Sequence, residues 1–282
     1  MRLAIVAALL LSGLVAGCVS LTESLDSSFL FRARPTDPER LARVAQLDGV
    51  EEVRITAPDG VTIHGWLKRA PAAAKGERYP LVIVFGGVAR ETSWMLNWGE
   101  KPPAWGWLVV NYRGYGLSGG VPSENTVVED AKRIYDYAAA RPDIDPEKIV
   151  VLGRSLGSYV AVRLAASRPL AGTILATPFD SIAAVAGGRY PFLPMRLLVG
   201  GRYDSASIAP SIRTPALFLL AGTDDVIPPQ HGEALAKAWG GPKSLFTLPE
   251  TGHRGVEWRK EYWTHIARFL GGLAPAQQAR AL

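Results

Sequence analysis

Five continuous apolar segments follow one another from residue 81 onward, and they constrain the fold more than any other feature of the sequence. Each has four or five residues and none contains a charged side chain; they are 81–85, 107–111, 149–152, 173–176 and 216–220. Runs without alternation of polar and apolar residues are typical of parallel strands that are covered on both faces. The chain is therefore predicted to build a buried parallel sheet.

Helical patterns separate these segments. Between the second and third, residues 126–140 carry apolar side chains at helical spacing, namely Val127, Ala131, Ile134, Tyr135 and Ala138. Thr126 is followed three residues later by Glu129, which predicts a capping box at the start of that helix.

The region before the first run has a different pattern. Residues 52–56 and 61–67 alternate polar and apolar side chains around Asp59-Gly60, which predicts an antiparallel hairpin. His64 falls in the second of these strands and is interpreted as a polar-face residue without a catalytic role. Together the patterns predict an α/β three-layer sandwich, with a mostly parallel central sheet and helices on both faces.

The N-terminus has the pattern of a secretory signal, because Arg2 precedes an apolar run too short to span a membrane comfortably. Residues 15–18, Val-Ala-Gly-Cys, resemble the lipobox of bacterial lipoproteins. The resemblance implies cleavage before Cys18, the only cysteine, and its acylation. The protein would then be anchored in the bacterial cell envelope, on the periplasmic side of the outer membrane if the source is Gram-negative. The alternatives are an ordinary signal peptide or an uncleaved anchor with an incidental cysteine.

The expected organisation follows from these boundaries. A signal peptide (1–17) precedes a lipid-anchored tether with a lead-in helix (18–48), an α/β domain (49–272) and a C-terminal tail (273–282). Within the domain, residues 179–214 form a connection too long for an ordinary α/β unit. We interpret this segment as a lid over a site, with a packed surface excursion as the alternative.

Composition excludes several classes of function. The hydrophobic fraction of 48% and the net charge of +5 do not fit a disordered chain. The basic residues are scattered rather than interleaved with aromatic ones, which argues against nucleic-acid binding. The sequence has no metal-ligand cluster, phosphate loop or dinucleotide motif, so no cofactor is expected. We expect a monomer that acts on a small substrate.

A candidate nucleophile lies at residues 153–157, Gly-Arg-Ser-Leu-Gly, which connect the strand 149–152 to a helical pattern at 159–166. This strand–turn–helix context is that of a nucleophile elbow, and it favours Ser155. Residues 116–120 also fit G-x-S-x-G. They lie in a glycine-rich loop with no helix directly after Ser118, so Ser118 is not favoured.

An activated serine needs a base. His253 lies on a loop after the strand-like segment 244–248 and is favoured, because such a loop can reach a serine at a neighbouring strand end. His231 and His265 fall in helical segments and are interpreted as surface or packing residues.

The base in turn needs an orienting acid. Asp224 and Asp225 both follow the strand 216–220, and either keeps the order serine, acid, histidine. The register before Pro228 favours Asp224 and leaves Asp225 as the alternative. Asp180 is a third candidate.

From about residue 50 to 270 the chain resembles serine hydrolases of the α/β-hydrolase superfamily, closest to the Bem46-like and ABHD13/ABHD17-like proteins. The residues that carry the resemblance are 111–124, 153–157, the Asp224 turn and Gly252-His253. The resemblance implies a triad of Ser155, Asp224 and His253, with the backbone amide of Leu156 as one oxyanion donor.

Relatives often place His-Gly after the strand that ends here at Phe85, whereas this chain has Gly86-Gly87-Val88. The amide of Val88 is expected to supply the second oxyanion donor, because the role belongs to the backbone. Four tryptophans lie just downstream, at 94, 98, 105 and 107. They are interpreted as packing residues, with acyl-chain contact as the alternative.

These features predict hydrolysis of an ester or thioester through an acyl-enzyme. A peptidase or amidase on the same fold is the first alternative. A non-catalytic lipoprotein that binds ligands is the second.

Overall fold

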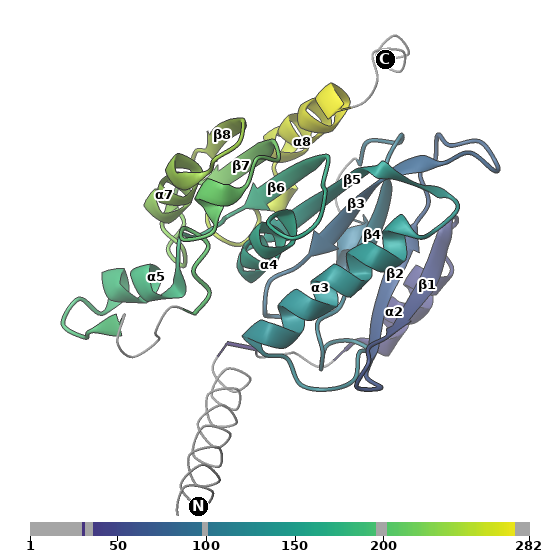
Figure 1. The fold of residues 1–282 in the computed structure, drawn as a ribbon, viewed down its shortest axis with the longest axis horizontal. Helices are drawn as coiled ribbons and strands as arrows, with labels where there is room; N and C mark the ends of the chain where they lie inside the picture. The colour runs from purple at the N-terminus through teal and green to yellow at the C-terminus, as the bar shows by residue number, and fades with distance from the viewer. Residues whose placement is uncertain (1–29, 32–35, 98–100, 196–201, 274–282) are drawn as a thin grey trace, which may run out of the picture.

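The computed structural model of the 282-residue chain describes residues 30–31, 36–97, 101–195 and 202–273. An eight-stranded sheet in the order β1-β2-β4-β3-β5-β6-β7-β8 forms its centre (Figure 1). The strands are β1 Val50–Thr56, β2 Thr62–Lys68, β3 Tyr79–Phe85, β4 Gly106–Val110, β5 Ile144–Arg154, β6 Gly172–Ala176, β7 Ala216–Ala221 and β8 Lys243–Leu248. Strand β2 pairs antiparallel with β1 and β4, and the strands from β4 through β8 pair in parallel. The predicted hairpin and parallel sheet are confirmed.

Helices cover both faces of the sheet. The α-helices are α2 Pro38–Ala45, α3 Glu124–Ala139, α4 Leu156–Ala165, α5 Ile182–Arg189, α7 Pro229–Ala238 and α8 Lys260–Leu273. Short 3₁₀ turns are η1 Ser93–Asn97, η2 Ala209–Ser211 and η3 Val256–Trp258. The α/β three-layer sandwich that the sequence predicted is confirmed.

Strand β3 illustrates how the two faces are filled. Leu81, Ile83 and Phe85 point to the face where α3, α4 and α7 pack. Val82 and Val84 point to the other face, against α2, η1 and α8. A strand buried on both sides needs no polar residues, which explains the continuous apolar runs.

The N-cap of helix α3 lies three residues before the one that the sequence suggested. Its N-cap is Ser123, whose Oγ accepts a hydrogen bond from the Thr126 amide at 3.2 Å. Thr126 Oγ1 in turn accepts from the Ser123 amide at 2.7 Å. The predicted box of Thr126 and Glu129 is therefore wrong, since Thr126 closes a box as its N3 member. Glu129 pairs with Lys132 at 2.6 Å instead.

The helical segment that contains His265, predicted over residues 256–270, is divided in two. Trp258 ends η3 and Lys260 starts α8, with Arg259 between them in an extended conformation (φ −81°, ψ 132°). The Trp263 indole donates to the Glu257 carbonyl at 2.9 Å and fixes this corner.

His64 is fully buried, so its assignment to an exposed polar face was wrong. The Asn111 side-chain amide lies 3.2 Å from His64 Nδ1. Because Asn111 Oδ1 already accepts from the Thr92 amide and hydroxyl, its NH₂ group faces the ring and Nδ1 is the acceptor. Nε2, which then carries the proton, lies 3.1 Å from Glu52 Oε1 without a hydrogen bond between them. His64 is a packing residue that is held through its Nδ1 atom.

No helix in the described ranges is both long and apolar enough to span a membrane. The predicted signal segment 1–17 and Cys18 lie outside the described residues.

Candidate active site

Ser155 occupies the corner between β5 and α4 in a strained conformation, with φ 54° and ψ −123°. Its neighbours explain why the chain can turn so sharply. A Cβ atom on Gly157 would overlap the Phe85 carbonyl, and one on Gly153 would overlap the Gly157 carbonyl. The glycines of the motif are thus required by the close approach of strand and helix, and the turn presents the Ser155 hydroxyl beyond the sheet edge.

The structure brings His253 and Asp224 to this serine. His253 Nε2 lies 3.1 Å from Ser155 Oγ, and His253 Nδ1 lies 2.8 Å from Asp224 Oδ2. The other carboxylate oxygen, Oδ1, accepts from the Val226 and Ile227 amides at 2.9 and 2.8 Å. An ionised carboxylate only accepts, so Nδ1 carries the imidazole proton and Nε2 is free to receive one from the serine.

The other carboxylates considered from the sequence lie elsewhere. Asp225 is exposed on the pocket rim. Asp180 Oδ1 contacts His231 Nδ1 at 3.0 Å rather than His253. Of the two neighbouring aspartates, only Asp224 contacts the His253 ring.

Ser118, the other match to the motif, is buried in the loop before α3. Its Oγ accepts from the His64 amide at 2.9 Å and donates to the Asn111 carbonyl at 3.2 Å. These bonds fasten the loop to β2 and the end of β4, which gives Ser118 a structural role.

Two tyrosines hold the strand-end segment on which Val88 lies. The Tyr112 hydroxyl donates to the Gly86 carbonyl and the Tyr115 hydroxyl to the Val88 carbonyl, each at 2.8 Å. Burial raises the pKa of both hydroxyls, which keeps them protonated as donors. The Leu156 amide is the first of α4 and has no acceptor within the helix. Val88 and Leu156 both line the pocket beside Ser155, and their roles as oxyanion donors remain predictions.

Arg154 is a residue that the sequence did not single out, because the motif leaves its second position free. Its Nη2 donates to the His253 carbonyl at 2.7 Å, and its Nε lies 3.5 Å from Glu257 Oε2. Glu257 also accepts from the Gly255 amide at 3.2 Å. Arg154, which directly precedes Ser155, therefore connects the serine corner to the loop that carries His253.

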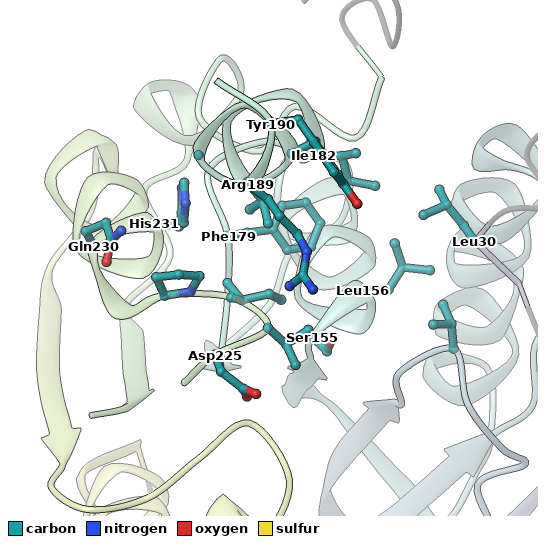
Figure 2. A pocket seen from close by; sticks show the side chains of 17 residues that line it. Leu30, Ser155, Leu156, Phe179, Ile182, Arg189, Tyr190, Asp225, Gln230 and His231 are labelled. Carbon is teal, nitrogen blue, oxygen red and sulfur yellow. The ribbon is translucent and has the colours of Figure 1, made fainter. Parts of the chain in front are cut away.

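A cavity of about 470 Å³ opens above Ser155 (Figure 2). Most of its lining is apolar, and much of it comes from the predicted lid segment 179–214, including Phe179 and α5. Trp105 and Trp107 are buried in the core on the opposite face of the sheet, which favours the packing interpretation; Trp98 lies outside the described residues. Across the described part of the chain, no group of His, Cys, Asp or Glu side chains could hold a metal ion.

The comparisons with known proteins agree with this architecture. Residues 76–199 match the family described as serine aminopeptidase, S33. An uncharacterized protein of Mycobacterium tuberculosis strain H37Rv is 34% identical over 208 residues, 73% of each chain. The α/β hydrolase domain-containing protein WAV2 of Arabidopsis thaliana is 29% identical over 273 residues, covering 88% of this chain and 86% of its own.

Solved structures show the same fold. Acetyl xylan esterase 1 from Thermoanaerobacterium has a TM-score of 0.65 at 16% identity, over 82% of this chain and 86% of the esterase. A puromycin-hydrolyzing peptidase of Mycobacterium tuberculosis has a TM-score of 0.60 at 20% identity, over 78% of this chain and 37% of the peptidase.

Fold and site together define a serine hydrolase. The chain belongs to the α/β-hydrolase superfamily, as its relatives and its sheet order establish.

Proposed function

We propose that the protein hydrolyses an ester or thioester acyl bond through an acyl-enzyme on Ser155, with His253 as base and Asp224 as the orienting acid. The observation that carries the proposal is the continuous contact from Asp224 Oδ2 through the His253 ring to Ser155 Oγ, over 2.8 and 3.1 Å. The strained serine and the cavity above it add to the argument, because a structural serine has no need of either.

The chemical steps follow from this geometry. His253 Nε2 removes the hydroxyl proton while Ser155 Oγ attacks the carbonyl carbon, and the oxyanion forms beside the amides of Val88 and Leu156. His253 then returns the proton to the leaving alcohol or thiol, which leaves an acyl ester on Ser155. A water molecule, deprotonated by the same nitrogen, releases the acid and restores the serine. Each oxyanion donor is expected to contribute about 2.7–4 kcal/mol to the stabilisation of the transition state.

The lining of the cavity supports an acyl substrate. Leu156, Phe179, Ile182 and Val185 give it apolar walls, and such walls bind a hydrocarbon chain by removing its surface from water. Acetyl xylan esterase 1 and an esterase of Pyrococcus furiosus are among the structures that share the fold.

A peptidase or amidase is the second candidate. It is favoured by the description of the matching family as serine aminopeptidase and by the fold shared with a puromycin-hydrolyzing peptidase. The same Ser155 and His253 would also cleave an amide, so only a comparison of substrates distinguishes an esterase from a peptidase.

The test is a panel of p-nitrophenyl esters, acyl thioesters and aminoacyl anilides, with wild type, Ser155→Ala and Ser118→Ala. We expect ester or thioester hydrolysis that Ser155→Ala abolishes and that the folded fraction of Ser118→Ala retains. Anilide hydrolysis exceeding ester hydrolysis would identify a peptidase. A folded wild type that hydrolyses no member of the panel would favour a binding module.

We propose in addition that Cys18 is acylated and anchors the protein in the cell envelope. The support is the sequence alone, in the lipobox-like residues 15–18 and the firm anchoring that several acyl chains provide. Cys18→Ser should move the protein from the membrane to the soluble fraction. Unchanged fractionation would contradict the proposal.

A further inference from the structure

One face of helix α5 lines the cavity, and the last residue on that face is charged. Ile182, Val185, Ala186 and Arg189 all border the cavity, and their spacing of three, four and seven residues places them on one side of a helix. The first three are apolar, as the cavity requires. The fourth is an arginine, whose side chain extends from α5 into the cavity toward its Ser155 end (Figure 2).

Among the described residues, no carboxylate lies within ion-pair distance of the Arg189 guanidinium. Asp180, near the start of the predicted lid segment 179–214, already contacts the ring of His231 and accepts from the amide of Ser181. Asp225 also lines the cavity, but its carboxylate points away from Arg189 (Figure 2). A guanidinium has five donors in a planar arrangement that matches a carboxylate or phosphate. The cavity therefore presents an unused anion-binding group above an apolar wall.

We propose that the substrate of this site carries an anionic group, a carboxylate or phosphate, on the chain that enters the cavity, and that Arg189 binds it. The inference rests on the proposed function, in which Ser155 attacks the same molecule. The apolar face of α5 would contact the hydrocarbon part, while Arg189 would form charge-assisted hydrogen bonds with the anion. Arg189 is then a specificity-determining residue.

A purely structural role for Arg189 leads to different expectations. A basic side chain in the last turn of a helix interacts favourably with the helix dipole. Replacement would then change stability slightly and affect all substrates alike. Binding of an anion predicts instead that replacement discriminates between charged and neutral substrates.

The kinetic test compares kcat/KM for p-nitrophenyl butyrate with that for the mono-p-nitrophenyl esters of succinate, glutarate and adipate. We expect the wild type to prefer at least one of the charged esters. Arg189→Met should lower the ratio of kcat/KM for the charged ester to kcat/KM for butyrate about tenfold, the effect of losing one charge-assisted contact at a partly exposed site. Arg189→Lys should retain part of the preference. Arg268→Met removes an equal charge from α8, on the other face of the sheet, and should change neither rate.

A second measurement does not depend on hydrolysis. In the Ser155→Ala background, calorimetry would compare the binding of monoethyl glutarate and of a butyl phosphate monoester with that of neutral ethyl butyrate. Tighter binding of either anion that Arg189→Met removes would support the inference, and the two anions distinguish a carboxylate from a phosphate. Equal affinities with and without Arg189 would overturn it, even if the wild type proved an active esterase. Charge-dependent binding without any hydrolysis by the wild type would overturn the proposed function, and Arg189 would then be the anion-binding residue of a site that binds ligands without cleaving them.

Discussion

Two histidine–aspartate pairs lie near the same cavity, and only one of them adjoins a nucleophile. His253 Nδ1 is 2.8 Å from Asp224 Oδ2, and His231 Nδ1 is 3.0 Å from Asp180 Oδ1. The distances are nearly equal and both imidazole rings are largely buried. The difference lies at the other ring nitrogen. His253 Nε2 meets the Ser155 hydroxyl, whereas among the described residues His231 Nε2 makes no such contact. A buried pair alone is thus not a catalytic group.

The second pair has a structural explanation. Asp180 is the second residue of the predicted lid segment, and its carbonyl accepts from the amides of Ser205 and Ala206 at 2.8 and 3.0 Å. His231 lies in the first turn of α7. The Asp180–His231 pair therefore joins the start of the predicted lid segment to helix α7, and we expect it to support stability rather than the chemical step.

The two histidines should differ most in the chemical step. His253→Ala should lower kcat/KM for an ester by about ten-thousandfold or more, since loss of a triad base removes activation of the serine. His231→Ala should lower it by less than about tenfold, because that ring contacts no reacting atom. Initial rates on p-nitrophenyl butyrate provide the measurement. Equal losses in the two variants would break the distinction between the pairs.

The two aspartates sharpen the same comparison. Asp224→Asn should lower kcat by about ten-thousandfold, because an amide favours the wrong tautomer of His253. Asp180→Asn should instead reduce the free energy of unfolding by about 1 kcal/mol, the usual size of one hydrogen bond. Rates and urea unfolding curves on both variants separate the effects. Asp225→Asn is the matched control, and a large loss of kcat there would show that the wrong carboxylate has been assigned to His253.

Arg154 distinguishes the first pair in another way, since it bonds to the His253 carbonyl. Arg154→Met should lower kcat by about tenfold to a hundredfold with little change in KM, because the histidine loop loses a positioning contact. Arg154→Lys should recover part of the loss. A purely structural arginine would give reduced stability with unaltered kcat per folded molecule, and that result would refute the positioning role.

The smallest expected effect concerns His64, through the pH dependence of the free energy of unfolding. Burial lowers the pKa of His64, although Glu52 opposes the shift. In the unfolded chain this histidine has a pKa of about 6.5, so it binds a proton more readily there than in the folded protein. The contribution to stability is present above that pH and declines as the pH falls. Urea unfolding between pH 8 and 5 should show a flatter profile for His64→Gln than for wild type, and less flattening for the more exposed His265→Gln. An unchanged slope for His64→Gln would contradict this account.

The sequence predicted the sheet well because its strands are buried on both faces and carry an unmistakable apolar signal. It also placed Ser155, His253 and the pair Asp224 and Asp225 at the ends of neighbouring strands, because these ends meet at one edge of a parallel sheet. The structure brings Ser155, Asp224 and His253 into contact, and their catalytic roles remain predictions. It could not predict the contact between Asp180 and His231, because these residues lie 51 positions apart and neither belongs to a recognisable motif. The N-cap at Ser123 was missed because serine and threonine are both good N-cap residues. Only the position of the first helical turn shows that the cap is Ser123 and not Thr126.

The central claim is that Ser155 is the nucleophile of the first pair. The direct measurement is reaction of the folded protein with a fluorophosphonate probe, followed by intact mass and peptide mapping. The account predicts one adduct on the peptide that contains Ser155, in the wild type and in Ser118→Ala, and none in Ser155→Ala. Labelling that survives Ser155→Ala would contradict the account.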